Sequence, residues 1–384
     1  MKIEAEQKRF VDLVEAATGS KFRPANKLTI LQNGDQIFPA MLAAIRSAKH
    51  SIGFTTYVYW SSDIASQFAD ALSERARAGV KVRLLVDAVG GAVMNARTVW
   101  QLERAGVRVA WFRPLRWPYM RKLNNRTHRK VLVVDTKHGF CGGVGIADEW
   151  AGNADTPNHF RETHAQITGP AIADLFASFA ENWQEATGER LGLMPQPADA
   201  GTIAIHTASS TAGTPPTVME RLFQAVITAA QHRLWITTAY FVPSDRLCDA
   251  LSEAVARSVD VRLLTNGPLT NHRITRWAGR ASYARLLGAG VKIYEYQGTV
   301  LHSKVLTVDG AWGTIGSANV DDRSLVLNDE LNISFTDLDL IGQLDRQFEI
   351  DTQRAREIRP SEWPGRPLPG RLAESGASLF RHQL

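Results

Sequence analysis

The stretch "THRKVLVVDTKHGFCGGVGIADEW", residues 127–150, has a histidine and a lysine two residues apart, then an aspartate and a glycine turn at intervals of seven. The stretch "VLHSKVLTVDGAWGTIGSANVDDRS", residues 300–324, repeats this spacing. Residues two apart in a β-strand point to the same face, so each histidine should project together with its lysine. The repeated residues are His128, Lys130, Asp135 and Gly142 in the first stretch, and His302, Lys304, Asp309 and Gly316 in the second.

The segments around these two stretches are also repeated. "AKHSIGFTTYVYWSSD", residues 48–63, matches "AQHRLWITTAYFVPSD", residues 230–245, and each follows a helix-like segment. "VKVRLLVD" and "LERAGVRVAW" then correspond to "VDVRLLTN" and "LLGAGVKIYE", in the same order. Strands that alternate with helices indicate an α/β fold. We therefore predict two homologous α/β/α-sandwich halves with mixed, largely parallel sheets. Five matched segments in one order argue against two unrelated α/β domains.

Length and composition fit this organisation. The chain has 384 residues, of which 44% are hydrophobic and 22% charged, as in a globular protein of more than one domain. A Gly/Pro/Ala-rich stretch is the predicted joint between the halves. The predicted units are an N-terminal helical extension (1–27), the first half (28–187), the linker (188–201), the second half (202–355) and a C-terminal tail (356–384).

Two facing half-sites would provide two imidazoles and two ammonium groups, a set that suits a phosphodiester. The lysines can neutralise the non-bridging oxygens while one histidine attacks phosphorus. The other histidine can protonate the leaving alcohol and later activate water or a second alcohol. Zinc-ligand spacings are absent, and lysine is a poor metal ligand, so we predict no metal. A non-catalytic phosphate-binding module is the alternative, against which the intact His and Lys in both stretches argue.

Basic residues are concentrated before each histidine. No Asp or Glu occurs from Arg104 to Val134 or from Val261 to Tyr294, which predicts positive potential at the mouth of the site. The first run also contains aromatic residues, for example Trp117, a mixture that suits a lipid headgroup surface. The same mixture could bind nucleic acid or form a solvated loop.

Net charge, cysteine count and the length of apolar runs limit where in the cell the protein can act. The net charge of +5 suits an anionic partner without identifying it, and two cysteines imply no disulfide framework. No run of about 18 apolar residues occurs, so we predict that nothing spans a membrane. A protein that handles lipid would then be cytoplasmic and associate peripherally with the inner face of the cell membrane.

The twice-repeated HxKxxxxD pattern with its glycine turn resembles the phospholipase D superfamily. From about residue 28 to 355, the sequence resembles bacterial cardiolipin synthases, notably in "TTYVYW", "HFRETHAQITGPAIADL", "TTAYFVPSD" and "GSANVDDRSLVLNDELN". The resemblance implies one active site at the interface of the halves, with neither a metal nor another cofactor. We expect the chain to resemble members that bind the membrane peripherally rather than those with N-terminal membrane spans.

The resemblance also implies residue roles. His128 would be the nucleophile and His302 the general acid and base. Asp135 and Asp309 would support the site structurally. One departure concerns Gly145, which stands where the family usually has Asn. The remaining implied roles are phosphate contact for Lys130, Lys304 and Asn319, orientation of the histidines for Glu162 and Glu330, and a phosphate-facing turn formed by Gly142, Gly143, Gly316 and Ser317.

The leading functional hypothesis is phosphatidyl transfer, in which two phosphatidylglycerol molecules give cardiolipin and glycerol through a phosphohistidine. Hydrolysis to phosphatidic acid is the nearest alternative, and a nuclease of the same superfamily is the next. The expected partners are an anionic phospholipid surface containing phosphatidylglycerol, and glycerol or another alcohol as acceptor. Nucleic acid is not an expected partner, and the oligomeric state is left open.

Overall fold

The computed structural model describes residues 2–114, 124–213, 215–366 and 368–378. The strands of the first half are β1 (Arg23–Gln32), β2 (Ser51–Thr56), β3 (Lys81–Asp87), β4 (Arg108–Phe112), β5 (Val131–Val134), β6 (His138–Gly142) and β7 (Thr163–Thr168). Those of the second half are β8 (Ile203–Ser210), β9 (Arg233–Thr237), β11 (Asp260–Asn266), β12 (Lys292–Tyr296), β13 (Val305–Val308), β14 (Trp312–Gly316), β16 (Glu330–Phe335) and β17 (Ala355–Ile358). A separate two-stranded sheet consists of β10 (Phe241–Val242) and β15 (Val320–Asp321).

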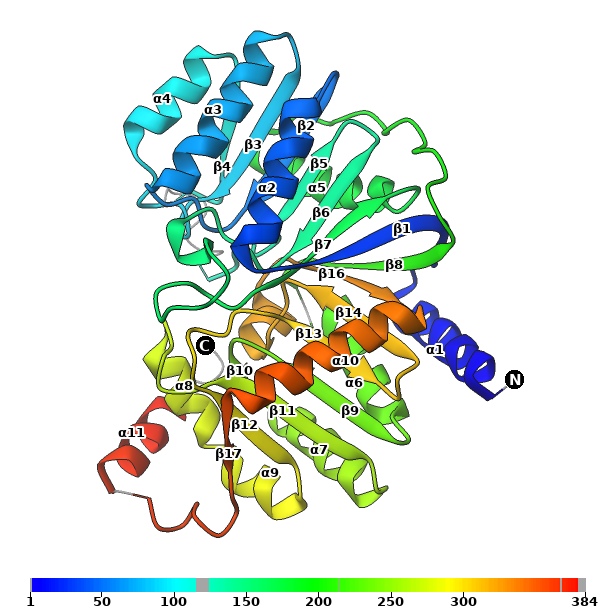
Figure 1. Cartoon of the computed structure of the whole chain (residues 1–384), viewed down its shortest axis with the longest axis vertical. Helices are drawn as coiled ribbons and strands as arrows, with labels where there is room; N and C mark the ends of the chain where they lie inside the picture. Colours follow the sequence, from blue (N-terminus) through cyan, green and yellow to red (C-terminus); the bar gives the residue numbers. More distant parts are fainter. Residues whose placement is uncertain (1, 115–123, 214, 367, 379–384) are drawn as a thin grey trace.

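The two halves share one strand order and together form a continuous 15-stranded sheet (Figure 1). The order is β1-β7-β6-β5-β2-β3-β4 in the first half and β8-β16-β14-β13-β9-β11-β12 in the second, with β17 added at the far edge. β1 pairs with β8 in antiparallel fashion and so joins the halves at the middle of the sheet. The predicted α/β fold with two homologous halves is confirmed.

The sheet is mixed, as predicted, but it is not largely parallel. Within the described large sheet, the parallel pairs are β2–β3, β3–β4, β9–β11 and β11–β12, and the other neighbours run antiparallel. The parallel strands are those that a helix connects, whereas β5–β6 and β13–β14 are joined by tight turns that require antiparallel pairing. Alternating strand and helix patterns indicate the first kind of pair more clearly than the second.

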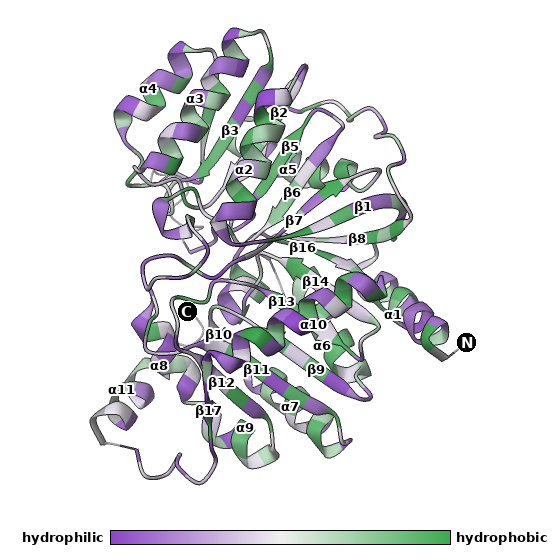
Figure 2. Cartoon of the chain, in the orientation of Figure 1, coloured by the Kyte–Doolittle hydropathy of each residue, from purple (hydrophilic) through white to green (hydrophobic). Residues whose placement is uncertain are grey.

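Helices cover both faces of the sheet, and Figure 2 shows hydrophobic strands between helices with hydrophilic outer faces. Ser62 and Ser244 occupy matching positions, and their side chains accept from backbone N–H groups at the start of α3 and α7. The helices are α1 (Lys2–Thr18), α2 (Asn33–Ser47), α3 (Asp63–Arg77), α4 (Ala96–Arg104), α5 (Ile172–Thr187), α6 (Val218–Ala229), α7 (Asp245–Ala256), α8 (Arg273–Arg280), α9 (Tyr283–Ala289), α10 (Leu338–Gln353) and α11 (Leu368–Ser378), with a 3-10 turn at Asp148–Trp150 and a π-helical turn at Arg323–Leu327.

The hydrophobic cores explain how the halves hold together. One core lies under α5 and α10 and contains residues of both halves, for example Leu175 and Leu344. α1 packs on α6 of the second half through Phe10 and Val14, although β1 directly after it belongs to the first half. The boundaries between the five predicted units remain predictions.

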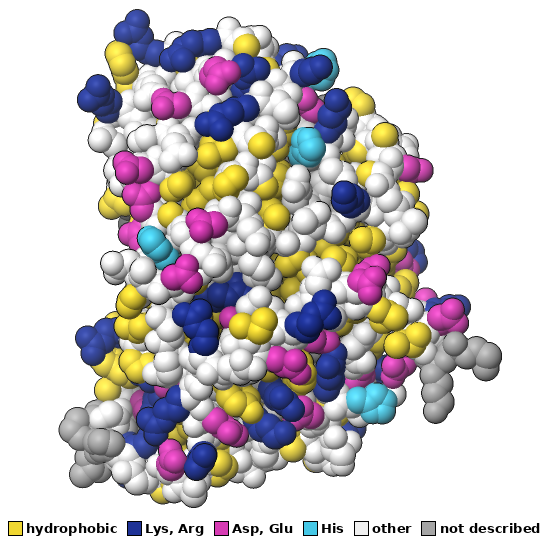
Figure 3. Space-filling model, viewed as in Figure 1, with side chains coloured by type: hydrophobic (Ala, Val, Ile, Leu, Met, Phe, Trp, Pro, Cys, Tyr) yellow, Lys and Arg dark blue, Asp and Glu magenta, His cyan; other side chains and the backbone are white. Residues whose placement is uncertain are grey.

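Several basic residues of the two acid-free runs are paired with acidic residues from elsewhere in the chain. The loop 115–123, which holds most of the first aromatic–basic segment, lies outside the described residues. Arg113 is buried and pairs with Glu185, while Arg276 and Arg280 both pair with Glu295. Figure 3 likewise shows basic and acidic side chains interspersed on the face it presents. Acidic residues from elsewhere in the chain therefore neutralise these three arginines, and positive potential at the mouth of the site remains a prediction. Among the described residues, no helix is both long and apolar enough to cross a membrane.

Candidate active site

The two HxK segments directly precede β5 and β13, and each is held by the opposite half. His128 precedes β5, and its backbone N–H donates to the Asp329 carbonyl at 2.9 Å. His302 precedes β13, and its backbone N–H donates to the Arg161 carbonyl at 2.7 Å. The glutamate that follows each acceptor in the chain is thereby brought beside the histidine.

Each imidazole is paired with that glutamate. His128 Nδ1 lies 2.9 Å from Glu330 Oε1, and His302 Nδ1 lies 2.7 Å from Glu162 Oε2. Both carboxylates are fully buried, and the histidine side chains are only 10% and 5% exposed. A carboxylate at Nδ1 fixes the tautomer that carries its proton there and leaves Nε2 available for chemistry. The halves thus exchange glutamates, and neither half contains a complete His–Glu pair.

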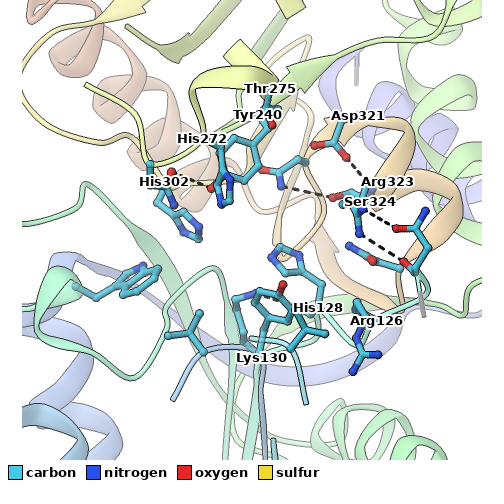
Figure 4. A pocket seen from close by; sticks show the side chains of 18 of the residues that line it. Arg126, His128, Lys130, Tyr240, His272, Thr275, His302, Asp321, Arg323 and Ser324 are labelled. Atoms are coloured by element: carbon cyan, nitrogen blue, oxygen red, sulfur yellow. Dashed lines mark hydrogen bonds between the residues drawn. The ribbon is translucent and has the colours of Figure 1, made fainter. Parts of the chain in front are cut away.

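Both histidines line one pocket of about 430 Å³ (Figure 4). Lys130 and Asn319 also line it, as predicted site residues. Lys304 is not in the pocket wall: its ammonium donates to the His302 carbonyl and lies 3.1 Å from His302 Nδ1. The other lining residues include Tyr57, Trp60, Arg126, Trp150, Tyr240, His272, Asp321, Arg323 and Ser324, none of which was a predicted site residue.

Burial sets the protonation states of the bases. It lowers the pKa of His128 to about 4, even though Glu330 favours the imidazolium. It also lowers the pKa of Lys130 to about 7 and that of Lys304 to about 8. Near pH 7, His128 is therefore neutral and can act as a nucleophile, while the lysines are close to their titration points.

The two glutamates differ in electrostatics. Burial raises the pKa of Glu162, despite the nearby Lys304 ammonium and the Thr163 N–H. Burial acts in the same sense on Glu330, but His128, Lys130 and the Ser317 hydroxyl outweigh it and lower the pKa of Glu330. The carboxylate beside His128 is consequently the more firmly ionised of the two.

The glycine turns lie behind the glutamates and outside the pocket wall. A Cβ at Gly143 would lie 2.6 Å from Glu162 Oε2, and a Cβ at Gly316 would overlap Asn332 Oδ1. Gly142 packs in the same way on His164, and the Ser317 hydroxyl donates to Glu330 Oε2 at 2.5 Å. Gly143 and Ser317 thus contact the two carboxylates, whereas the resemblance implied a phosphate-facing turn.

The two aspartates of the repeated motif bind backbone remote from the pocket. Asp135 accepts from the N–H groups of Lys49, His50 and Ser51 at 2.8–2.9 Å. Asp309 accepts in the same way from the residues at 231–233 and also from Arg9. These contacts tie the start of β2 to β5 and the start of β9 to β13, which supports the predicted structural role.

Replacing Asp135 with Asn should destabilise the protein without disturbing its chemistry. Asn tolerates the left-handed backbone at this position (φ 52°), but its amide nitrogen cannot accept the Lys49 N–H. We expect the free energy of unfolding to fall by about 2 kcal/mol in urea titrations, with kcat within about twofold of wild type. Asp12→Asn, at an exposed position on α1, is the control. A large loss of kcat in the folded variant would contradict the structural role.

Two buried ion pairs, neither of them predicted, hold the backbone segments beside the two histidines, one pair for each histidine. Arg126 donates to both oxygens of Asp87, which also accepts the Thr127 N–H. Arg161 donates to both oxygens of Asp351 and so links the first half to α10. The sequence carried a signal for the first pair, because a polar residue ends both copies of one repeated strand: Asp87 ends "VKVRLLVD" and Asn266 ends "VDVRLLTN". Asn266 accepts the Leu301 N–H just as Asp87 accepts the Thr127 N–H. No pattern in the sequence marked the second pair.

The site offers no ligand set for a metal. Within the described ranges, no group of three or more His, Cys, Asp or Glu side chains could hold an ion. The pocket instead combines three imidazoles and a lysine with two arginines and amides, donors that suit a phosphate oxygen. The duplicated fold and this pocket define a phospholipase D-type enzyme.

Comparisons with known proteins place the chain within that class. A family model described as "Cardiolipin synthase, PLD-like domain" matches residues 41–183 and 223–352. The chain is 32% identical to a probable cardiolipin synthase of Bacillus subtilis (strain 168), covering 98% of this chain and 76% of the relative. It is 37% identical to a cardiolipin synthase of Geobacillus kaustophilus, covering 93% and 72%. The chain belongs to the cardiolipin synthase family.

Solved structures support the fold alone. A phosphatidylserine synthase from Haemophilus influenzae Rd KW20 superposes with a TM-score of 0.75 at 13% identity, covering 99% of this chain and 100% of that chain. A polyphosphate kinase from Porphyromonas gingivalis gives a TM-score of 0.60 at 14% identity, covering 87% and 49%.

Proposed function

We propose that the protein joins two phosphatidylglycerol molecules into cardiolipin and releases glycerol. The observation that carries this proposal is the pair of cross-half His–Glu contacts, whose two imidazoles line one pocket. The names of its relatives and the family model supply the lipid substrate.

The reaction divides into two displacements at phosphorus. His128 Nε2 attacks the phosphorus of the first phosphatidylglycerol, and the bond from phosphorus to the glycerol oxygen breaks. His302 gives that oxygen a proton, so glycerol leaves and a phosphatidyl–His128 remains. His302 then takes the proton from a hydroxyl of the second phosphatidylglycerol, whose oxygen attacks phosphorus. The phosphorus–nitrogen bond breaks, and cardiolipin and free His128 result.

Phosphate charge would be met by cations and amides on both sides of the pocket. Lys130 lines the wall, and so does Asn319, whose Nδ2 amide group can donate to a phosphate oxygen. Lys304 would act from behind His302, where burial and the Lys304 charge together lower the pKa of that imidazole. An entering phosphodiester anion offsets these cations and favours the protonated His302 that the first step needs.

The pH profile should report the lysine pKa values. Lysine carries its charge below its pKa, and His128 is neutral above about 4, so kcat/KM should peak between these limits. We expect its alkaline limb near the Lys130 pKa of about 7. In Lys130→Arg, the guanidinium keeps its charge, and the limb should move to the Lys304 pKa of about 8. A wild-type profile that stays flat well above pH 8 would contradict this assignment.

Incubation with phosphatidylglycerol vesicles tests the proposal directly. Cardiolipin and glycerol in equal amounts are the expected products. Phosphatidic acid in place of cardiolipin would assign hydrolysis, because water competes with alcohol for the same intermediate. Cleavage of single-stranded DNA without lipid turnover would assign a nuclease.

We infer further that the protein docks peripherally on an anionic membrane from the cytoplasmic side, with the pocket mouth facing the lipid. The loop after β3 carries Val89 and Val93, exposed by 43% and 63%, and the segment after β11 carries Leu269 and Ile274, exposed by 37% and 54%. Both segments also line the pocket, through Val89 and His272. A phosphodiester lies at the headgroup level of a bilayer, so apolar residues around the mouth suit contact with the acyl boundary.

Removing two of these side chains should weaken vesicle binding selectively. For Val93→Ser combined with Ile274→Ser, we expect about tenfold weaker binding to phosphatidylglycerol vesicles in sedimentation assays. Turnover of a short-chain phosphatidylglycerol below its micelle concentration should not change, because neither residue lines the pocket. Leu338→Ser combined with Ile350→Ser, on exposed positions of α10, is the matched control. Equal vesicle binding by both double variants would contradict the docking surface.

A further inference from the structure

The repeat continues beyond the glycine turns, which allows the two sides of the pocket to be compared position by position. Ile146 pairs in parallel with Tyr59, and Val320 pairs in parallel with Phe241 at the corresponding place in the second half. This register makes Gly145 the counterpart of Asn319, and it makes Trp150 the counterpart of Ser324. An amide and a hydroxyl in the second half are therefore replaced by a hydrogen and an indole in the first.

The indole occupies the space that a side chain at residue 145 would need. A Cβ built on Gly145 would lie 2.9 Å from two ring atoms of Trp150 and 3.0 Å from Val58 Cβ. Trp150 is only 2% exposed and is fixed further by Phe160, whose ring centroid lies 4.8 Å away. In the second half, Asn319 Nδ2 lies 3.4 Å from Ser324 Oγ, so the two polar residues share that space. Gly145 and Trp150 thus form a size-matched pair.

Trp150 contacts both members of one His–Glu pair. Its Nε1–H donates to Glu162 Oε2 at 3.3 Å, the same oxygen that faces His302 Nδ1. Its ring stands perpendicular to the His302 ring, with 5.1 Å between centroids. In the other pair, the Ser317 hydroxyl donates to Glu330. Gly143 stands at the matching position and has no hydroxyl to offer Glu162, so the indole supplies that donor from another direction.

We propose that Trp150 is the positioning residue of the Glu162–His302 pair, and that Gly145 stays small in order to seat its indole. This inference rests on the proposed function for the acid and base role of His302. The His128 side of the site uses a serine hydroxyl for the same purpose, so the duplicated enzyme has two differently built carboxylate supports. The glycine at residue 145 then reflects a local exchange of amide for indole rather than a lost phosphate contact.

Trp150→Phe isolates the N–H donor, because it keeps an aromatic ring in place. We expect kcat on phosphatidylglycerol to fall about tenfold while KM changes less than about twofold. Without the indole donor, Glu162 holds the His302 proton more strongly, so the alkaline limb of the kcat profile should move to higher pH. Trp183→Phe removes an indole bond to Glu189 at 2.7 Å outside the pocket, and it should leave kcat and the limb unchanged.

The size match is tested by coupling the two positions. Gly145→Asn alone should lower kcat at least about tenfold through overpacking against the indole. The double variant Gly145→Asn with Trp150→Ser copies the second half. Its kcat relative to wild type should exceed the product of the relative kcat values of the two single variants by about fivefold or more. If Gly145→Asn fails to fold, Trp150→Phe still decides the donor role.

The outcomes separate this inference from the proposed function. A wild type that releases only phosphatidic acid would contradict cardiolipin synthesis, and the same variants would then be read on the hydrolytic rate. Wild-type kcat and an unmoved limb in Trp150→Phe would overturn the positioning role. An equal loss of kcat in Trp150→Phe and Trp183→Phe, with no shift of the alkaline limb in either variant, would likewise reduce Trp150 to a packing residue.

Discussion

Replacing His128 with Asn is expected to lower phosphatidyl transfer by about 10⁴-fold or more, close to the background of the assay. The asparagine amide can still donate to Glu330, so the buried carboxylate keeps a partner, but no nitrogen remains that can attack phosphorus. Rates would be measured as cardiolipin formed from phosphatidylglycerol carrying ³²P. The same label should remain on wild-type protein after a rapid quench, as an acid-labile adduct, and should be absent from the variant.

A matched histidine outside the site controls for nonspecific effects. His232 lies at the start of β9 with its side chain 70% exposed, and His232→Asn should transfer and label like wild type. Unfolding curves should coincide for both variants, since neither change leaves a buried charge without a partner. Substantial label on His128→Asn would mean that the other imidazole carries the phosphatidyl group.

The fold was largely predictable because the chain repeats itself. "AKHSIGFTTYVYWSSD" and its counterpart identify β2 and β9, and the two HxK stretches identify β5 and β13, so the matching strand order of the halves follows. The pairing of these strands was less predictable. The periodicity of a buried strand does not depend on the direction of its neighbour, and the tight turns after Asp135 and Asp309 reverse the chain.

The site was predictable only as far as its residues recur at fixed spacing. His128, Lys130, His302 and Asn319 line the pocket as expected, because the motif places them in the segments just before β5 and β13 and just after β14. No spacing within one half could show that Glu330 serves His128, since each glutamate crosses to the other half.

Trp150 was missed for a different reason: an isolated tryptophan has the same sequence signature whether it packs in a core or borders a catalytic pair. Composition along the chain also does not reveal which acidic residues pair with the basic runs, as Glu295 does with Arg276 and Arg280.

His302→Asn should lower phosphatidyl transfer by about 10³-fold, through loss of proton transfer in both steps. The leaving glycerol would depart as an alkoxide, and the second alcohol would attack without a base. The variant nevertheless keeps His128 and its carboxylate partner, so the nucleophile itself is intact. A substrate whose leaving group needs no proton should therefore restore the first step selectively.

A p-nitrophenyl ester of phosphatidic acid provides that substrate, because nitrophenolate is a stable anion at neutral pH. With His302→Asn, we expect a rapid burst of nitrophenolate equal to the enzyme concentration, followed by a slow phase set by breakdown of the adduct. With His128→Asn, no burst should occur, since no covalent intermediate can form. The reverse pattern, with a burst from His128→Asn and none from His302→Asn, would exchange the two roles. The closer anchoring of Glu330 by Ser317 favours His128 as the nucleophile, because it keeps the carboxylate beside His128 ionised while that imidazole bears the phosphatidyl group.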